Sequence, residues 1–402
     1  MRALSGCLAL SAVLVMLGGQ HAAAADTDGG SGTYPRVIPT LDARYRLESV
    51  DQADKPSDAL ASTLRLRLGY AAALSREWQG GLVLEDVHRI GPDNYNDTAN
   101  GQTDRPVVAD RQDTELDQAW IGFTGFGDTT VAAGRQVVAL ANQRFVGNVG
   151  FRQNEQTFDG LTVRSSAGPV NGFFAHLSRA NRIFGAHHPD VSKARTDMKT
   201  DLLHLDWRLP GVTLSPYAYF IDNRDAPATS HRDLGLRVAG KRAGGAGVDY
   251  VAEYARQQHY RDGDQAIDVG YADLEFGWHG LGAAWRVGYE KLGGNGRYGF
   301  ATPLATLHAF QGWADRFLAT PADGIRDAWL RVGGRAAGFA WTAVAHDFRA
   351  DRGSSHYGRE LDLALGHGLG QHYSARLEAA EYRADAHATN TRILWLTLQA
   401  NY

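Results

Sequence analysis

The chain has 402 residues, and its 41 lysines and arginines against 45 aspartates and glutamates give a formal net charge of −4. This mildly acidic balance shows no electrostatic signature of nucleic-acid binding. The mean hydropathy is −0.34, and no run of 18 apolar residues occurs, which excludes a conventional transmembrane helix. The length suits either two soluble domains or one large barrel of strands.

The N-terminal residues have the pattern of a secretory signal. Arg2 precedes a short apolar run at residues 8–17, and the alanines at 22–25 form an A-x-A-type cleavage site before Asp26. We therefore expect residues 1–25 to be a signal peptide and residues 26–38 a short N-terminal segment. Cys7 is the only cysteine, so the mature chain would have no disulfide and no thiol chemistry.

Alternation of apolar and polar residues begins after this segment. Leu64, Leu66 and Leu68 share one face of a strand, and Arg65 and Arg67 share the other. Leucine alternating with arginine is typical of a membrane strand whose apolar face meets lipid and whose charged face meets a water-filled lumen. Similar segments continue to the C-terminus. The expected strands, about 18 in all, are residues 41–48, 63–74, 79–89, 115–124, 130–138, 158–165, 170–179, 202–209, 212–222, 233–241, 248–257, 269–278, 281–291, 326–335, 339–349, 359–366, 373–383 and 391–402.

The last expected strand, residues 391–402, ends on an aromatic residue. Tyr402, Leu398 and Leu396 share its apolar face, whereas Trp395 and Ile393 fall on the polar face and weaken the alternation. Such an ending resembles the C-terminal strand of bacterial outer-membrane barrels. We therefore predict that Tyr402, Leu398 and Leu396 act as a barrel-assembly signal, and that this strand closes the barrel by pairing with residues 41–48.

The fold class predicted is all-β: a transmembrane antiparallel β-barrel of about 18 strands over residues 39–402, in the outer membrane of a Gram-negative cell. The connections alternate between short turns, expected on the periplasmic side, and longer extracellular loops. A soluble β-sandwich has no reason to segregate loop length in this way. The barrel must be closed, because an open sheet edge would leave backbone groups unpaired in hydrocarbon.

Charged residues recur on the face opposite the lipid-facing positions. They would brace and solvate a wide lumen, because an arginine or lysine facing lipid at the midplane costs about 2–4 kcal/mol. Arginines left without an acid partner would instead attract anions to a constriction. The alternation does not show whether Arg135 points inward or outward, since the apolar Val131 and Ala133 share its face. The candidate pore-lining residues are Arg44, Arg46, Arg65, Arg67, Arg164, Arg208, Arg237, Arg286, Arg331, Arg376, Asp206, Asp249, Glu253, Glu275, Glu290, Asp327, Glu360, Asp362 and Glu378.

Enzymatic readings find little support. The histidines are dispersed, so no Ser/His or Asp/His constellation is apparent, and we predict no catalytic residue, no cofactor and no metal site. His187, His188 and Asp190 lie in a polar loop without further ligands close in sequence. Leu304, Leu307, Phe310, Trp313, Phe317 and Leu318 have near-helical spacing inside a long connection, which predicts a short amphipathic helix that packs on the rim or folds into the lumen.

Three stretches, GRQ at 134–136, RFVGNVGFRQNEQTFDG at 144–160 and TPLATLHAFQGWADRFLATP at 302–321, resemble local patterns of the alginate-export family of outer-membrane porins. The resemblance extends from about residue 39 to 402. It implies an 18-stranded monomeric barrel that secretes an anionic polysaccharide through an arginine-lined pore. It also implies that Arg135 points into the lumen and that Arg152 is a pore residue. The chain departs from this picture in its acidic balance and in the many carboxylates of its expected lumen.

The function predicted from the sequence is an outer-membrane channel for diffusion of saccharides or anionic compounds, similar to alginate exporters. The expected partners are outer-membrane lipid, the barrel-assembly machinery and an anionic polysaccharide or small solute, with no nucleic acid. One alternative is an uptake porin for small organic anions or oligosaccharides. Others are an outer-membrane hydrolase and an adhesin that uses the long loops.

Overall fold

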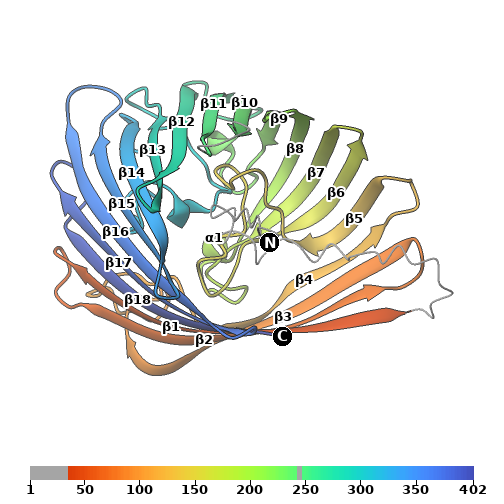
Figure 1. Ribbon diagram of the computed structural model, residues 1–402, viewed down its shortest axis with the longest axis horizontal. Coiled ribbons are helices and arrows are strands. Elements are labelled where there is room, and N and C mark those ends of the chain that lie inside the picture. The colour runs from red at the N-terminus through yellow and green to blue at the C-terminus, as the bar shows by residue number, and fades with distance from the viewer. Residues whose placement is uncertain (1–34, 242–246) are drawn as a thin grey trace, which may run out of the picture.

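The computed structural model describes residues 35–241 and 247–402, which form one closed sheet of 18 antiparallel strands. Figure 1 shows these strands following one another around the wall in sequence order. The expected signal peptide lies outside the described residues, and so does most of segment 26–38. The last residues of that segment are already strand, because β1 begins at Arg36.

The strands agree with the predicted set in number and order, although many are longer than the alternation alone indicated. They are β1 (Arg36–Gln52), β2 (Ala59–Ala73), β3 (Trp78–Asn94), β4 (Asp113–Phe123), β5 (Thr129–Gln136), β6 (Thr157–Ala167), β7 (Val170–Asn181), β8 (Arg195–Leu209), β9 (Val212–Ile221), β10 (His231–Lys241), β11 (Asp249–His259), β12 (Asp268–Gly280), β13 (Ala283–Leu292), β14 (Ile325–Ala336), β15 (Phe339–Arg349), β16 (His356–Leu369), β17 (Tyr373–Ala384) and β18 (Thr391–Asn401).

The barrel closes between its first and last strands, as the terminal alternation predicted. The register pairs Leu47 with Leu396 and Tyr45 with Leu398. At the end of this seam, the Leu41 amide donates to the Tyr402 carbonyl oxygen at 2.9 Å, and the Tyr402 amide donates back at 2.8 Å. No edge strand remains, so every strand has a hydrogen-bonding neighbour on both sides.

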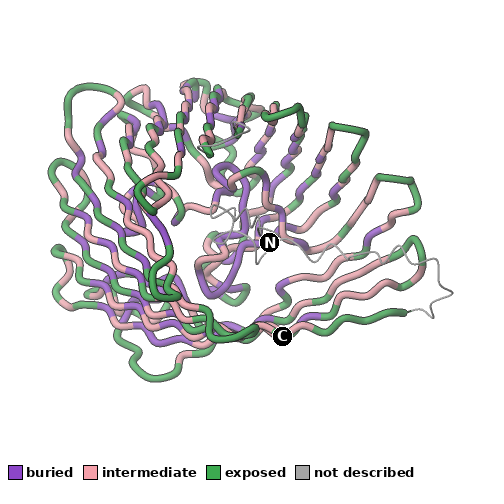
Figure 2. The backbone as a smooth tube through the Cα atoms, in the orientation of Figure 1, coloured by how far each residue is buried: buried purple, intermediate pink, exposed green. Residues whose placement is uncertain are grey.

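The wall is apolar outside and charged inside. On β16, Leu361 and Leu363 are 48% and 47% exposed, whereas the intervening Glu360 and Asp362 are 3% and 0% exposed. Such burial reverses that of a soluble protein and is the pattern of a strand that spans a bilayer. Figure 2 shows the resulting alternation along the strands, together with a buried stretch of chain inside the ring.

Connections at one end of the barrel are short, and those at the other end are longer. Three short helical elements occur on the long side: α1 (Val191–Ala194), η1 (Pro227–Thr229) and η2 (Leu307–Ala309). The predicted amphipathic helix near residues 304–318 is therefore wrong, because only η2 forms there. Leu304, Trp313 and Phe317 are buried in irregular chain inside the barrel, whereas Leu318 is exposed. Within the described residues, none of the helices has the length and apolar character needed to cross a bilayer.

Candidate solute passage

Two of the long connections fold into the barrel, and together they form the inner layer, residues 137–156 and 293–324. A parallel bridge joins Val146 to Leu304. The Gly147 amide donates to the Leu304 carbonyl oxygen at 2.8 Å, and the Thr306 amide donates to the Gln143 carbonyl oxygen at 3.0 Å. The two connections therefore hold each other, although the bonded residues are more than 150 positions apart in the sequence.

The first connection of the inner layer crosses the lumen. At one end, the ring of Phe145 packs against Tyr217 on β9 and Tyr271 on β12, with centroids 5.2 and 5.3 Å away. At the other end, Phe151 lies 5.7 Å from the ring of Trp395 on β18. These strands lie on opposite sides of the barrel (Figure 1). We call residues 145–151 the crossing segment, because they connect the two walls.

The arginines of β1 and β2 all point inward, but most of them are covered. Arg44, Arg46 and Arg65 are 6%, 2% and 2% exposed. Arg44 donates to the carbonyl oxygen of residue 150 at 2.8 Å, and Arg46 donates to that of residue 151 at 2.5 Å. Arg65 pairs with Asp42 instead. This row of arginines therefore holds the end of the crossing segment and does not line an open passage.

Arg67 is surrounded by carboxyl groups. It pairs with Glu85 on β3 and, at 3.3 Å, with Glu155 of the inner layer, and Asp117 on β4 lies nearby. Burial raises the pKa of Glu155 to about 8, against the opposing effect of the Arg67 guanidinium, and the nearby Asp117 and Glu85 also raise it. Arg67 is thus engaged by two carboxyl groups and is not available to attract a solute anion.

Two further arginines anchor the inner layer to the wall. Arg152 binds Glu48 on β1 and Asp315 in the second connection, both at 3.0 Å. Arg144 binds Glu290 on β13 at 2.6 Å. Burial alone would lower the pKa of the Arg144 guanidinium, but the Glu290 carboxylate raises it. Both arginines thus carry charge in buried contacts, where loss of one partner would leave the other uncompensated.

Every predicted acid has a neighbouring group within ion-pair or hydrogen-bond distance, and five of the nine pair with an arginine. Arg237 binds Glu253 at 2.9 Å, Arg376 binds Glu378 at 2.8 Å, and Arg286 binds both Asp249 and Glu275. The remaining acids are held as follows: Glu290 by Arg144, Asp206 by Ser215 and His204, Asp327 and Asp362 by His346, and Glu360 by the Ala314 amide.

Three inward arginines have no carboxylate within ion-pairing distance among the described residues. Arg164 on β6, Arg208 on β8 and Arg331 on β14 are all exposed. Arg164 lies 4.5 Å above the ring of Phe173, and Arg331 lies 5.7 Å from that of Trp329. β6 and β8 are far around the wall from β14. Arginines without an ion-pair partner therefore face the interior on both sides of the barrel.

Comparison with known families accords with this architecture. A model of the alginate export family matches residues 39–297, well over half of the chain. The chain belongs to the alginate export family. No curated protein sequence matches the chain. The β-barrel of this family member has the architecture of an outer-membrane porin.

Solved porin structures share the fold at low sequence identity. Pseudomonas aeruginosa OpdO is 14% identical, with a TM-score of 0.69 over 91% of this chain and 97% of its own. Pseudomonas aeruginosa OpdK, solved with vanillate, is 11% identical, with a TM-score of 0.70 over 91% and 98%. Acinetobacter baumannii OccAB4 is 11% identical, with a TM-score of 0.70 over 92% and 99%. These likenesses establish the barrel fold.

The two arginines implied by the family resemblance have different positions. Arg152 lies inside the barrel, in the inner layer, as described above. Arg135 pairs in register with Asp159 and binds it at 2.7 Å. The next residue, Gln136, is buried on the inner face, so alternation places Arg135 outside. The implied inward orientation of Arg135 is therefore corrected: its partner is an acid on the same outer face.

Several residues that organise the interior were not among the predicted site residues. Three of them lie in connections, where no strand alternation indicates the direction of a side chain: Arg144, Glu155 and Asp315. Trp329 lies on β14 beside Arg331 and provides its aromatic contact. The stretches 144–160 and 302–321, which resemble the alginate-export family, were the available signal for the first three. Nothing in the sequence indicated which wall residues they would contact.

Proposed function

We propose that this protein is a passive outer-membrane channel that favours anionic solutes, including acidic saccharides, and performs no covalent chemistry. The observation that carries the proposal is the set of three inward, exposed arginines, on both sides of the lumen, that have no carboxylate within ion-pairing distance among the described residues. Fixed charges of one sign concentrate counter-ions in a low-dielectric passage. Membership of the alginate export family and the vanillate in the OpdK structure, a carboxylate, support the same solute class.

Planar bilayer recording tests the selectivity. In a KCl gradient, the purified protein is expected to give stable conductance steps whose reversal potential has the sign of anion preference. Added polyuronate is expected to block them. Steps that prefer cations and ignore polyuronate would remove the anion-channel proposal and leave a porin. Absence of conductance together with hydrolase activity would favour an enzyme.

A second candidate is a channel for small organic anions rather than for a polymer, and the crossing segment favours it. A chain that connects opposite walls divides the lumen and leaves less room for a thick solute. Measuring the current with a monomeric uronate as the only anion separates the two candidates. Permeation by the monomer combined with block, but no translocation, of the polymer would favour the second.

We further propose that the protein is exported by cleavage of residues 1–25, assembles as a monomer and is inserted by the barrel-assembly machinery through its terminal strand. The Tyr402 ring lies outside, next to Tyr373 at a centroid distance of 5.9 Å. Replacing it in Y402S is expected to lower the amount of heat-modifiable barrel in the outer membrane several-fold. Y373S is the matched control, because it removes the neighbouring ring but not the terminal aromatic. Equal amounts of barrel in wild type and Y402S would contradict the assembly role.

A further inference from the structure

A row of arginines lies on the outer face of the barrel, at the long-loop ends of β15–β18. We call Arg349, Arg359, Arg383 and Arg392 the outer arginine strip. Arg359 precedes the exposed Leu361 on the same face of β16, and Arg392 precedes the exposed Leu394 in the same way. The strip therefore begins where the lipid-facing leucines end.

The strand register places like charges side by side in this region. Arg359 is directly opposite Arg383, and Arg349 is directly opposite Arg326 on β14, which also points outward. Like charges directly opposite each other destabilise a sheet. Each of these two arginine pairs therefore destabilises the barrel by charge repulsion. A bound external anion would remove that repulsion.

The carboxylates of this region are too few and too exposed to saturate it. Asp347 is shared by Arg349 and Arg359, at 2.8 and 3.2 Å. The four guanidinium side chains remain 54% to 76% exposed. Because each guanidinium has five N–H donors, most donors remain available. Asp347 also binds His356 at 3.0 Å, and Glu381 is shared by Arg383 and Arg392, so these two carboxylates each serve more than one cation.

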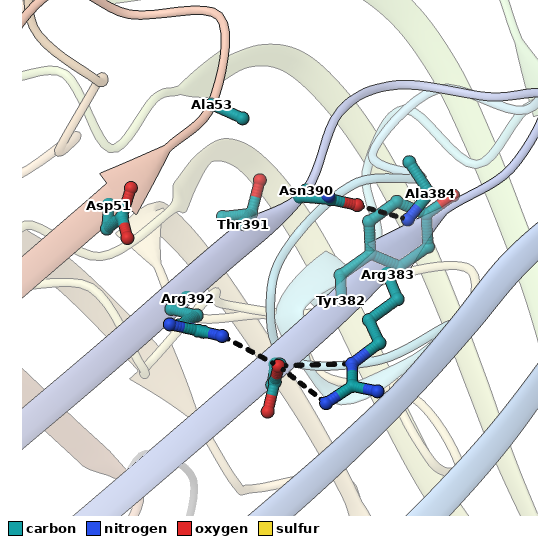
Figure 3. Close-up of a pocket in the computed structure, with 9 residues that line it drawn as sticks. Asp51, Ala53, Tyr382, Arg383, Ala384, Asn390, Thr391 and Arg392 are labelled. Atoms are coloured by element: carbon teal, nitrogen blue, oxygen red, sulfur yellow. Dashed lines mark hydrogen bonds and ion pairs between the residues drawn. The ribbon is translucent and has the colours of Figure 1, made fainter.

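The close-up in Figure 3 shows one end of the strip. Arg383 and Arg392 extend from neighbouring strands toward one carboxylate, that of Glu381, at 3.1 and 3.2 Å. The hollow beside them is lined by Asn390 and Thr391 among others and has a volume of about 430 Å³. Guanidinium groups and small polar groups thus border an open hollow on the side of the barrel.

We propose that the outer arginine strip binds the phosphorylated headgroups of anionic lipids in the outer leaflet. Paired guanidiniums match phosphate oxygens in charge and in bidentate geometry. The position at the upper limit of the apolar band is the depth of a headgroup, so the partner is a lipid and not a solute of the passage. This inference rests on insertion in the membrane and is independent of the proposed anion preference of the lumen.

The test compares the variant R359Q/R383Q with wild type and with R256Q. Arg256 also lies on the outer face, where it binds Asp268 at 2.7 Å, but outside the strip. Each protein is purified in a non-ionic detergent, checked for heat-modifiable barrel and mixed with a phosphorylated lipid A or its dephosphorylated form. Native mass spectrometry then counts the bound lipids.

Wild type and R256Q are expected to bind the phosphorylated lipid, and R359Q/R383Q about tenfold more weakly, as loss of charge-assisted hydrogen bonds predicts. R359K/R383K should recover part of the binding, because lysine restores the positive charge but not the bidentate geometry of a guanidinium. Equal binding by R359Q/R383Q and wild type would overturn the proposal. So would equal binding of the dephosphorylated lipid, or displacement by inorganic phosphate at the same concentration, which would indicate a site for a free anion.

Discussion

Reversing the three unpaired inward arginines, in R164E/R208E/R331E, is expected to convert an anion-preferring channel into a cation-preferring one. None of the three has a carboxylate within ion-pairing distance among the described residues, so no ion pair neutralises the positive charge that each presents to the passage. Reversal replaces three positive charges by three negative ones on opposite walls. Counter-ion concentration follows the sign of such fixed charges. The reversal potential in a KCl gradient should therefore change sign.

The matched control for this experiment is R256E, which reverses an arginine on the outer face. It should fold as a heat-modifiable barrel and keep the selectivity of the wild type. Single reversals are expected to shift the reversal potential in the same direction by smaller amounts. If the triple variant retained the sign of the wild-type potential, the selectivity would have to arise elsewhere. The ion pairs of the inner face, such as that of Arg237 with Glu253, would then be the next residues to examine.

Replacing Arg152 with alanine is expected to loosen the inner layer. Its guanidinium binds Glu48 and Asp315, and the Glu48 side chain is only 1% exposed. Removing one partner of a buried pair typically costs about 3–5 kcal/mol, because the remaining charge is left without compensation. The temperature at which the folded, heat-modifiable form is lost should fall. Single-channel conductance should rise and become noisier, since the end of the crossing segment is released.

R224A provides the comparison, because Arg224 makes an ion pair with Asp222 in an external connection and its side chain is 45% exposed. Arg261 also binds the Asp222 carboxylate, at 3.2 Å, so loss of the half-exposed Arg224 leaves that carboxylate paired and should cost little, roughly 0–1 kcal/mol. R224A should therefore resemble the wild type in both measurements. Identical transition temperatures and conductances for R152A and R224A would show that the Arg152 contacts do not hold the inner layer.

Much of the wall could be predicted from the sequence, because alternation in a strand directly reports which side faces lipid. Leucines on β2 and β16 gave this phase. Even the exceptions had a structural cause: Trp395 and Ile393 share the polar face of β18 because both are buried inside, where Trp395 contacts Phe151. Protein inside the lumen packs against apolar side chains on the inner face of the wall. Such side chains interrupt the alternation of apolar and polar residues in the sequence.

The interior could not be predicted in the same way. Arg44 and Arg331 are both inward arginines, but one is covered by residues of the inner layer and the other is exposed. The difference depends on contacts between residues more than 100 positions apart. The Arg135 orientation failed for a related reason. Its strand has small residues on both faces, so only the register with Asp159 and the burial of Gln136 identify the inner side.

The crossing segment also has a consequence for how the barrel closes. Its far end contacts Arg44 and Arg46 on β1 as well as Trp395 on β18, that is, both strands of the closing seam. It thus bridges this joint between the first and the last strand from inside the barrel. Lateral opening of the wall at this joint would have to break buried hydrogen bonds and ring contacts in addition to the strand ladder. The joint that completes the barrel is thereby reinforced from within.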